Sequence, residues 1–263
     1  MGSGLLFVLV FSTMSLITPI SSESFIKLPS EGAVFSSRKV RADDRVYCDS
    51  WRLSVETNNA GIWERIPERC TRFVEDYMTG GRYRSDLDVI ANFSSTFANS
   101  VKLAGDGRDA WVFDVDETLL SNLPYYENHG FGSEIFNETS FDDWVNVAKA
   151  PALPASLRLY KELQQLGFKV FLLTGRSEYQ REATEANLLF SGYSNWERLI
   201  LRGKFDQGKL ATVYKSERRQ ELVDEGYIIH GCSGDQWSDL LGYAVATRSF
   251  KLPNPMGNQW RVN

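Results

Sequence analysis

Two aspartates, Asp114 and Asp116, follow directly on the apolar segment at residues 110–113. Alternate side chains of an extended segment point to the same side, so both carboxylates can face one site. Close carboxylates repel each other, and proteins accommodate such a pair by binding a cation between them or by separating their pKa values. The pair therefore predicts a nucleophilic site that is assisted by a magnesium ion.

Further polar residues stand where other apolar segments end, or at the opening of a predicted helix. They are Thr174, Gly175 and Arg176 after residues 169–173, Asp235 and Asp239 after residues 227–231, and Lys215 at the opening of the helix predicted at residues 217–225. Lys209 competes with Lys215, and we prefer Lys215 because it stands at the helix opening. Ligand sites of parallel sheets lie at the carboxyl ends of the strands, so these residues are predicted to share a site with the two aspartates.

These motifs, in this order, resemble those of the haloacid dehalogenase-like hydrolases: Asp114-Val115-Asp116-Glu117-Thr118, Thr174, Lys215, and Gly234-Asp235 with Asp239. The resemblance implies that Asp114 attacks phosphorus and forms an aspartyl-phosphate, which divides one difficult displacement into two easier ones. Asp116 is expected to protonate the leaving oxygen and later to deprotonate water, a role that requires a pKa raised above that of its neighbour. Lys215 is expected to reduce the repulsion between Asp114 and phosphate.

The same resemblance implies Mg²⁺ as the cofactor, because this hard cation keeps several waters and takes few carboxylates. Its expected ligands are Asp114, the main-chain carbonyl of Asp116, and Asp235. Asp239 either ligates the ion or orients a bound water. A third interpretation of Asp239, a cap at the start of a helix, stays open.

Binding of the substrate is expected to involve residues beside the nucleophile and after the second apolar segment. The Thr174 hydroxyl and the Gly175 amide would bind phosphoryl oxygens, and Arg176 either assists them or forms a surface ion pair. Tyr125 and Tyr126 either stack on a leaving group or pack under a flap. The stretch between the first motif and Thr174 is too short for a full cap domain, which predicts an open site and a broad substrate range.

The pattern of residues 106–263 alternates strands and helices, which predicts an α/β fold with a doubly wound, Rossmann-like and mainly parallel sheet of the haloacid dehalogenase type, without a large cap. The strands are predicted at residues 110–113, 169–173, 198–201, 227–231 and 243–246, and the helices at residues 141–148, 155–166, 178–190 and 217–225. Residues 41–105 show an aromatic-rich helical pattern that predicts an N-terminal lobe of two or three helices. Pro67 is predicted to open one helix and Ser85 to cap another.

The N-terminus carries a pattern typical of secreted proteins. Residues 1–20 hold no charged side chain and contain an apolar run at residues 5–11, so we interpret residues 1–22 as a signal peptide; an N-terminal membrane anchor is the alternative. The sequons at Asn92 and Asn137 are compatible with glycosylation on that route. Cys48 and Cys70 could pair in an oxidising compartment, or all three cysteines could be buried thiols.

Composition and missing signatures exclude several functions. The net charge is −5 and no run of lysine or arginine stands out, which disfavours nucleic acid and anionic membranes as partners. With two histidines in the chain, a dinuclear metallophosphatase lacks ligands. Neither histidine follows an arginine, as a histidine phosphatase would require, and no arginine stands six residues after Cys232, as a cysteine phosphatase would require.

Nearly the whole mature chain resembles the plant acid phosphatases of class B type and their vegetative storage protein relatives. The matching segments include residues 47–52, 122–126, 214–216 and 250–256. The resemblance implies a secreted or vacuolar acid phosphatase for small phosphate monoesters, located in the cell wall or the vacuole, with a homodimer left open. The alternative is a storage protein with incidental activity, although such relatives can lose the nucleophile that this chain retains as Asp114.

Overall fold

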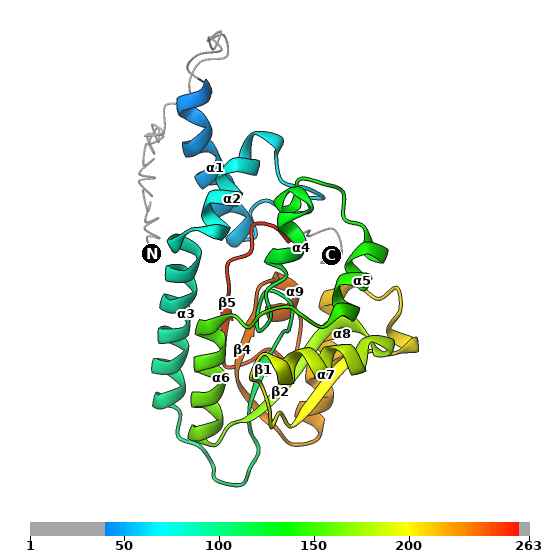
Figure 1. Ribbon diagram of the computed structural model, residues 1–263. Coiled ribbons are helices and arrows are strands. Elements are labelled where there is room, and N and C mark those ends of the chain that lie inside the picture. Colours follow the sequence, from blue (N-terminus) through cyan, green and yellow to red (C-terminus); the bar gives the residue numbers. More distant parts are fainter. Residues whose placement is uncertain (1–39, 258–263) are drawn as a thin grey trace, which may run out of the picture.

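The computed structural model describes residues 40–257, and Figure 1 shows a sheet enclosed by helices. The strands are β1 (Asp109–Phe113), β2 (Lys169–Ser177), β3 (Arg198–Arg202), β4 (Ile228–Gly234) and β5 (Arg248–Lys251). The α-helices are α1 (Val40–Glu56), α2 (Thr71–Thr79), α3 (Gly81–Ser100), α4 (Leu123–Glu127), α5 (Glu138–Val147), α6 (Pro154–Leu166), α7 (Arg181–Phe190), α8 (Ala211–Asp224) and α9 (Trp237–Leu240). Short 3₁₀ turns are η1 (Glu68–Cys70), η2 (Gly130–Gly132), η3 (Glu178–Gln180) and η4 (Lys204–Asp206). The predicted signal peptide, residues 1–22, lies outside the described residues.

The five strands form one parallel sheet in the order β3-β2-β1-β4-β5. From β1 the chain first builds outward to β3, and it then returns to the other side of β1 to add β4 and β5. β1 and β4 are therefore the neighbours at which the winding direction changes, and ligands of such sheets bind at this point. The predicted doubly wound α/β fold is confirmed.

Side chains of β1 alternate between two cores, one on each face of the sheet. Trp111 and Phe113 belong to the larger core, which α3 and α6 cover. Ala110 and Val112 belong to the smaller core, which α8 covers. Because every residue of β1 is buried, the strand holds the backbone at its carboxyl end rigidly.

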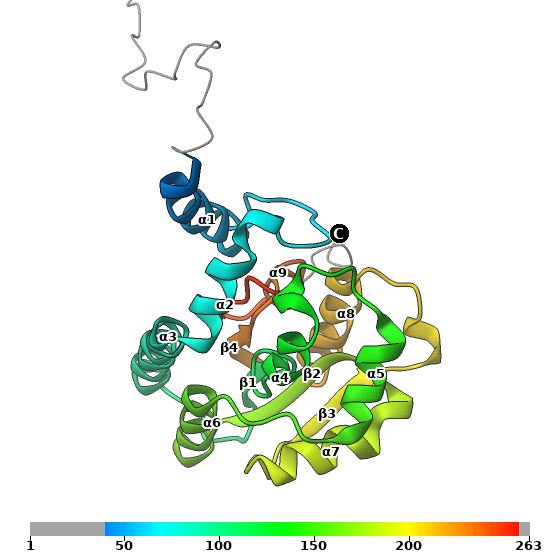
Figure 2. The ribbon, with the colours of Figure 1, turned by 45° about the horizontal axis from the view of Figure 1, so that its top comes forward.

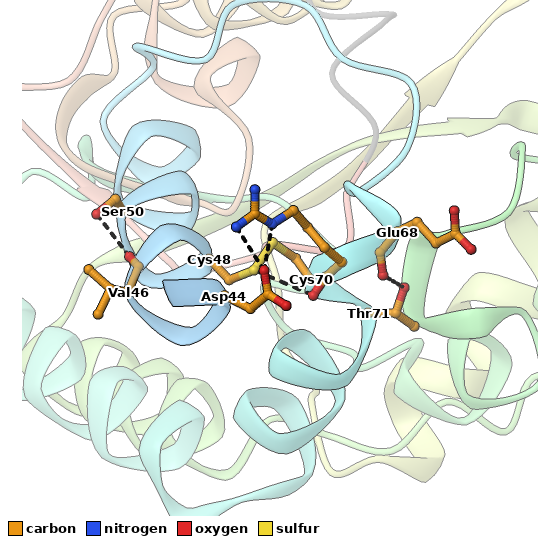
Figure 3. Close-up of a disulfide and its surroundings, with 8 residues drawn as sticks. Asp44, Val46, Cys48, Ser50, Glu68, Cys70 and Thr71 are labelled. Atoms are coloured by element: carbon orange, nitrogen blue, oxygen red, sulfur yellow. Dashed lines mark hydrogen bonds and ion pairs between the residues drawn. A yellow bond between two sulfur atoms is a disulfide. The ribbon is translucent and has the colours of Figure 1, made fainter. Parts of the chain in front are cut away.

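The N-terminal helices are attached to the sheet and to each other. Figures 1 and 2 show α3 lying beside α6, and a disulfide joins Cys48 of α1 to Cys70 of η1. Figure 3 shows this disulfide, beside which Arg69 donates to Asp44 of α1 at 2.9 Å. Among residues 40–257, no helix combines the length and the apolar character that a bilayer span requires.

The predicted strand at residues 243–246 is wrong, because the fifth strand is β5. The earlier segment forms a loop around the buried guanidinium of Arg219, which donates to the carbonyls of Tyr243 and Ala244 at 3.1 Å each. Ala244 has a φ of 51° and Gly242 a φ of 95°, values that a strand does not tolerate. An apolar run alone could not reveal this loop.

Several predicted element boundaries also need correction. Helix α8 begins at Ala211, six residues before the predicted start, because the fully buried Tyr214 anchors its first turns; Lys215 therefore lies inside the helix. Strand β2 continues past Leu173 and pairs with β3 again at Ser177 after a register shift. Ser85 does not cap a helix but lies inside α3, which begins after the extended residue Gly80.

Candidate active site

The candidate active site lies at the carboxyl edge of the sheet, where β1, β2 and β4 end near α4 and α5 (Figure 2). A cavity of about 610 Å³ opens there, large enough for a small-molecule ligand. Its walls include most of the predicted site residues: Asp114, Asp116, Gly175, Lys215, Asp235 and Asp239. Residues far apart in the sequence are thus brought together by the parallel topology.

Asp114 is fixed by the sheet and paired with a lysine. Its amide donates to the carbonyl of Ser233 at 3.0 Å, and Nζ of Lys215 donates to its Oδ1 at 2.6 Å. Lys215 Nζ also binds Oδ1 of Asp239. Burial raises the pKa of Asp114 well above its ordinary value, with Lys215 acting in the opposite direction. Burial lowers the pKa of Lys215, but the two aspartates outweigh it and raise that pKa, so the lysine stays charged.

Three buried carboxylates form a group with the geometry of a metal site. One oxygen each from Asp114, Asp235 and Asp239 lies within 4.8 Å of the others. Burial, the larger cause, and the charge of Asp239 raise the pKa of Asp235 to about 6. The hydrogen bond from Asn254 acts against this rise. Hard oxygen ligands at this spacing fit a divalent cation, and such a cation would favour their ionised forms.

Asp116 is only two residues from Asp114, but its carboxylate is paired with a different cation. Nη2 and Nε of Arg176 donate to its carboxylate at 2.7 and 3.0 Å, and Asn122 Nδ2 donates at 2.9 Å. Burial raises the pKa of Asp116, but Arg176 and Asn122 outweigh burial and hold it below its ordinary value. Without metal or substrate, the raised pKa belongs to Asp114 and the lowered one to Asp116, the reverse of the order that the expected role of Asp116 requires. The Arg176 side chain in this ion pair is 2% exposed, so it does not form a surface pair, whereas the Asp116 side chain is 24% exposed.

Asn122 connects the first motif to helix α5, a role that sequence reasoning did not assign. Its Nδ2 donates to Glu117 Oε2 at 3.0 Å as well as to Asp116, and its Oδ1 accepts from Trp144 Nε1 at 2.8 Å. Glu117 has a φ of 53°, which turns the chain back after Asp116. Burial, together with the charges of Asp116 and Asp235, raises the pKa of Glu117 well above its ordinary value.

The residues predicted to bind phosphate take up different positions on β2. Thr174 is buried, and its hydroxyl accepts from the amide of Arg176 at 3.1 Å. Gly175 is exposed in the cavity wall, and no atom lies within 4 Å of the position that a Cβ would occupy there. Ser177, the last residue of β2, also lines the cavity. A strand predicted to extend to this residue would have placed it at the site.

Asp239 takes the capping role, one of the three considered for it, and also pairs with a lysine. Its Oδ2 accepts from the amide of Gln236 at 2.8 Å, as a cap at the start of α9, while its Oδ1 binds Lys215. A Cβ at Gly234 would overlap the Asp239 side chain, so a glycine at the end of β4 permits this close approach.

The two lysines and the two tyrosines considered from the sequence are distinguished by their contacts. Lys209 Nζ pairs with Asp206 and Glu217 at 3.1 and 2.5 Å, whereas Lys215 binds Asp114. Tyr125 packs beneath the segment that contains η2, with its ring stacked on His129 at 4.0 Å between centroids. Tyr126 is buried too but reaches the cavity wall.

The remaining predicted sites lie outside the cavity or at its margin. Asn92 is exposed on α3. Asn137 is exposed where α5 begins, and its side chain accepts from the Ser140 amide at 3.1 Å. Cys48 and Cys70 form the disulfide of Figure 3, and Cys232 is a buried free thiol.

Known proteins resemble this chain over most of its length. Residues 35–260 match the family described as the acid phosphatases of subfamily IIIB of the HAD superfamily. Acid phosphatase 1 of Solanum lycopersicum is 56% identical over 81% of this chain and 84% of its own. A stem 28 kDa glycoprotein of Glycine max is 45% identical, over 80% and 83% of the two chains. Vegetative storage protein 1 of Arabidopsis thaliana is 38% identical, over 80% and 77%.

Among solved structures, the class C acid phosphatase of Bacillus anthracis is similar to this chain. The superposition has a TM-score of 0.61 and 25% sequence identity, and it covers 72% of this chain and 86% of the bacterial one. The parallel sheet and its flanking helices are thus shared with a phosphatase of known structure.

Proposed function

This chain belongs to the acid phosphatases of HAD subfamily IIIB, and we propose that it hydrolyses small phosphate monoesters through an aspartyl-phosphate at Asp114, with Mg²⁺ as the cofactor. The observation that carries the proposal is the position of Asp114. It is a buried carboxylate in the wall of the cavity, paired with Lys215 and grouped with two further carboxylates. A nucleophilic carboxylate requires such positive charge nearby to approach an anionic phosphate.

In the first step, an Asp114 oxygen forms a bond to phosphorus, and the bond between phosphorus and the leaving oxygen breaks. Asp116 donates a proton to that oxygen. A phosphate anion beside Asp116 carries the same sign of charge as the carboxylate, which raises the pKa of Asp116. The phosphate also competes with Asp116 for the guanidinium of Arg176. The pKa of Asp116, which is low while Arg176 is its partner, would therefore rise when substrate binds.

In the second step, Asp116 takes a proton from water, and the water oxygen attacks phosphorus and releases Asp114 and phosphate. The ionised form of Asp116, which Arg176 favours, suits this step. Lys215 offsets negative charge at Asp114, and Gly175 on the exposed part of β2 would offer its amide to a phosphoryl oxygen.

Asp114, Asp235 and Asp239 would hold the metal ion, with the Asp116 main-chain carbonyl as a further proposed ligand. When bound, the ion would neutralise charge on the carboxylates and on the phosphoryl group. Ionisation of Asp235, whose pKa is about 6, would then be favoured because metal binding displaces its proton.

The test compares the purified protein with Asp114→Asn on an aryl phosphate in the presence of Mg²⁺. We expect the variant to lose activity by about 10³-fold or more, as removal of a nucleophile does in other covalent mechanisms, and to melt as a folded protein. A chelator should abolish wild-type activity and added Mg²⁺ should restore it. Full activity of Asp114→Asn, or indifference to chelation, would contradict the proposal.

A second candidate function is storage of amino acids, favoured by the 38% identity to a vegetative storage protein. The retained Asp114 and the assembled site argue for catalysis. Both functions imply the secretory route, to the cell wall or a vacuole, which the glycoprotein relative also supports. Specific activity compared with abundance in tissue distinguishes the two: a storage role predicts high abundance with turnover close to that of Asp114→Asn.

A further inference from the structure

A continuous set of contacts joins the N-terminal helix to the proposed metal site. Glu56 is the last residue of α1 and contacts the segment that follows β5. Lys251 Nζ donates to its Oε2 at 2.8 Å, and the amide of Asn254 donates to its Oε1 at 3.0 Å. The side chains of Glu56 and Lys251 are each 14% exposed, so the ion pair is mostly shielded from water.

Asn254 carries this connection from Glu56 to Asp235. Its Oδ1 accepts from the amides of Met256 and Gly257 at 3.0 and 3.1 Å, and its Nδ2 donates to Asp235 Oδ2 at 2.7 Å. Two donors on one side and a carboxylate on the other permit only one orientation of the side-chain amide. Since Asn254 is 3% exposed, water cannot easily replace these partners.

We propose that Glu56 and Asn254 are positioning residues for the metal site: Glu56 holds the segment after β5 in place, and Asn254 then orients the Asp235 carboxylate toward the cation. This inference rests on the proposed function, in which Asp235 is a metal ligand. Residues that hydrogen-bond to a ligating carboxylate fix its orientation and contribute to metal affinity.

Loss of the Glu56 charge would weaken metal binding in two ways. In Glu56→Gln one acceptor oxygen replaces two, so the side chain cannot accept from both Lys251 Nζ and the Asn254 main-chain amide. Lys251 would lose its carboxylate partner and keep the Leu252 carbonyl, which leaves an uncompensated positive charge beside the segment that carries Asn254 and repels a cation at the site. The disulfide anchors α1 at Cys48, eight residues before Glu56, so the helix end is a firm support.

The experiment measures Mg²⁺ binding by calorimetry at pH 7 in the full-length wild type, Glu56→Gln, Asn254→Ala and the control Asp44→Asn. Asp44 lies on the same helix and pairs with Arg69, so its variant also loses one ion pair but none of the contacts that lead to Asp235. We expect the Kd for Mg²⁺ to rise about tenfold or more in the first two variants, as for other residues that support metal ligands, and to change less than about twofold in the control.

Melting without metal and kinetics at saturating Mg²⁺ separate this role from a general structural one. We expect Glu56→Gln and Asp44→Asn to melt at similar temperatures, and Glu56→Gln to keep the wild-type KM for an aryl phosphate. Equal Kd values for Mg²⁺ in Glu56→Gln and in the control would overturn the inference. If Glu56→Gln does not fold, the inference is overturned when folded Asn254→Ala binds Mg²⁺ with the wild-type Kd. A wild type that neither binds Mg²⁺ nor hydrolyses phosphate would instead overturn the proposed function, and this inference with it.

Discussion

Asp114 and Asp116 are two residues apart, and yet each carboxylate is paired with a different cation. Lys215 binds Asp114, whereas Arg176 binds Asp116, and the pKa values of the two aspartates are shifted in opposite directions. Since one aspartate must attack phosphorus and the other must exchange protons, separate electrical environments allow separate roles. The ion pair with Arg176 is the part that the sequence left unsettled, because spacing does not show where a long side chain points.

The pKa of Asp235 leads to a prediction about stability and pH. Its folded-state pKa of about 6 lies above the ordinary 3.8, so protonation stabilises the metal-free fold. This contribution is fully present below pH 3.8 and is lost as the pH rises through 6. We therefore expect the melting temperature of the metal-free wild type, relative to that of Asp235→Asn, to fall between pH 4 and pH 7.

Calorimetric melting of both proteins in a chelator checks this prediction, and the comparison removes the contribution of other titrating groups. Added Mg²⁺ should raise the wild-type melting temperature at pH 7 and leave that of Asp235→Asn nearly unchanged. A difference between the two proteins that does not vary with pH would contradict the assigned shift.

At the scale of elements, sequence patterns located most of the sheet but not the long-range contacts that shape its loops. The strands at β1, β2, β3 and β4 follow from short apolar runs, since parallel strands buried on both faces are apolar throughout. The loop before β5 depends on the buried guanidinium of Arg219, which no local pattern reveals. Asn254 lies in a segment that resembles the plant acid phosphatases, residues 250–256, but its role depends on contacts with residues distant in the chain.

A hydrogen bond connects Trp144 of helix α5 to Asn122 beside the first motif, and we predict that this bond supports catalysis. Trp144→Phe keeps the aromatic packing but removes the donor to Asn122, which in turn holds Asp116 and Glu117. A lost hydrogen bond of this kind costs about 1 kcal/mol, so we expect kcat to fall by about fivefold.

Steady-state kinetics of Trp144→Phe and the control Trp196→Phe check this prediction. Trp196 packs against the same core but precedes β3, at the amino edge of the sheet, so its variant should keep the wild-type kcat. Equal values of kcat in Trp144→Phe and the wild type would show that Asn122 needs no support from α5.

The disulfide between Cys48 and Cys70 should stabilise the association of α1 with η1. It spans 22 residues, and a cross-link of that size contributes about 3 kcal/mol, chiefly by restricting the unfolded chain. Urea unfolding of the Cys48→Ala, Cys70→Ala double variant should show a free energy of unfolding lower by about this amount. Reduced wild type should match the variant, and a loss below about 1 kcal/mol would contradict the predicted contribution.

At the scale of the whole molecule, both ends of the described chain contribute to the site. Helix α1 and the segment after β5 meet at Glu56, and the carboxylate group lies beyond Asn254. The family model likewise extends over residues 35–260, so the matching sequence includes both regions as well as the sheet. We therefore expect metal binding at this site to depend on helix α1 as well as on the parallel sheet.

The predicted secretory route is testable on the whole protein. We expect expression in plant cells to give a chain that lacks residues 1–22 and carries glycans at Asn92 and Asn137, because the apolar run at residues 5–11 is typical of a signal peptide. Intact mass spectrometry before and after enzymatic deglycosylation measures both. A product that retains residues 1–22 and loses no mass on deglycosylation would contradict this route.

The most direct test of the account is to trap the covalent intermediate. Asp116→Asn, which can no longer deprotonate water, should accumulate phosphoenzyme when it is mixed with an aryl phosphate and Mg²⁺ and then quenched in acid. Peptide mass spectrometry should locate one phosphoryl group on Asp114, and the double variant with Asp114→Asn should carry none. A phosphoryl group on another residue, or turnover in the wild type with no phosphoenzyme in either protein, would contradict nucleophilic catalysis by Asp114.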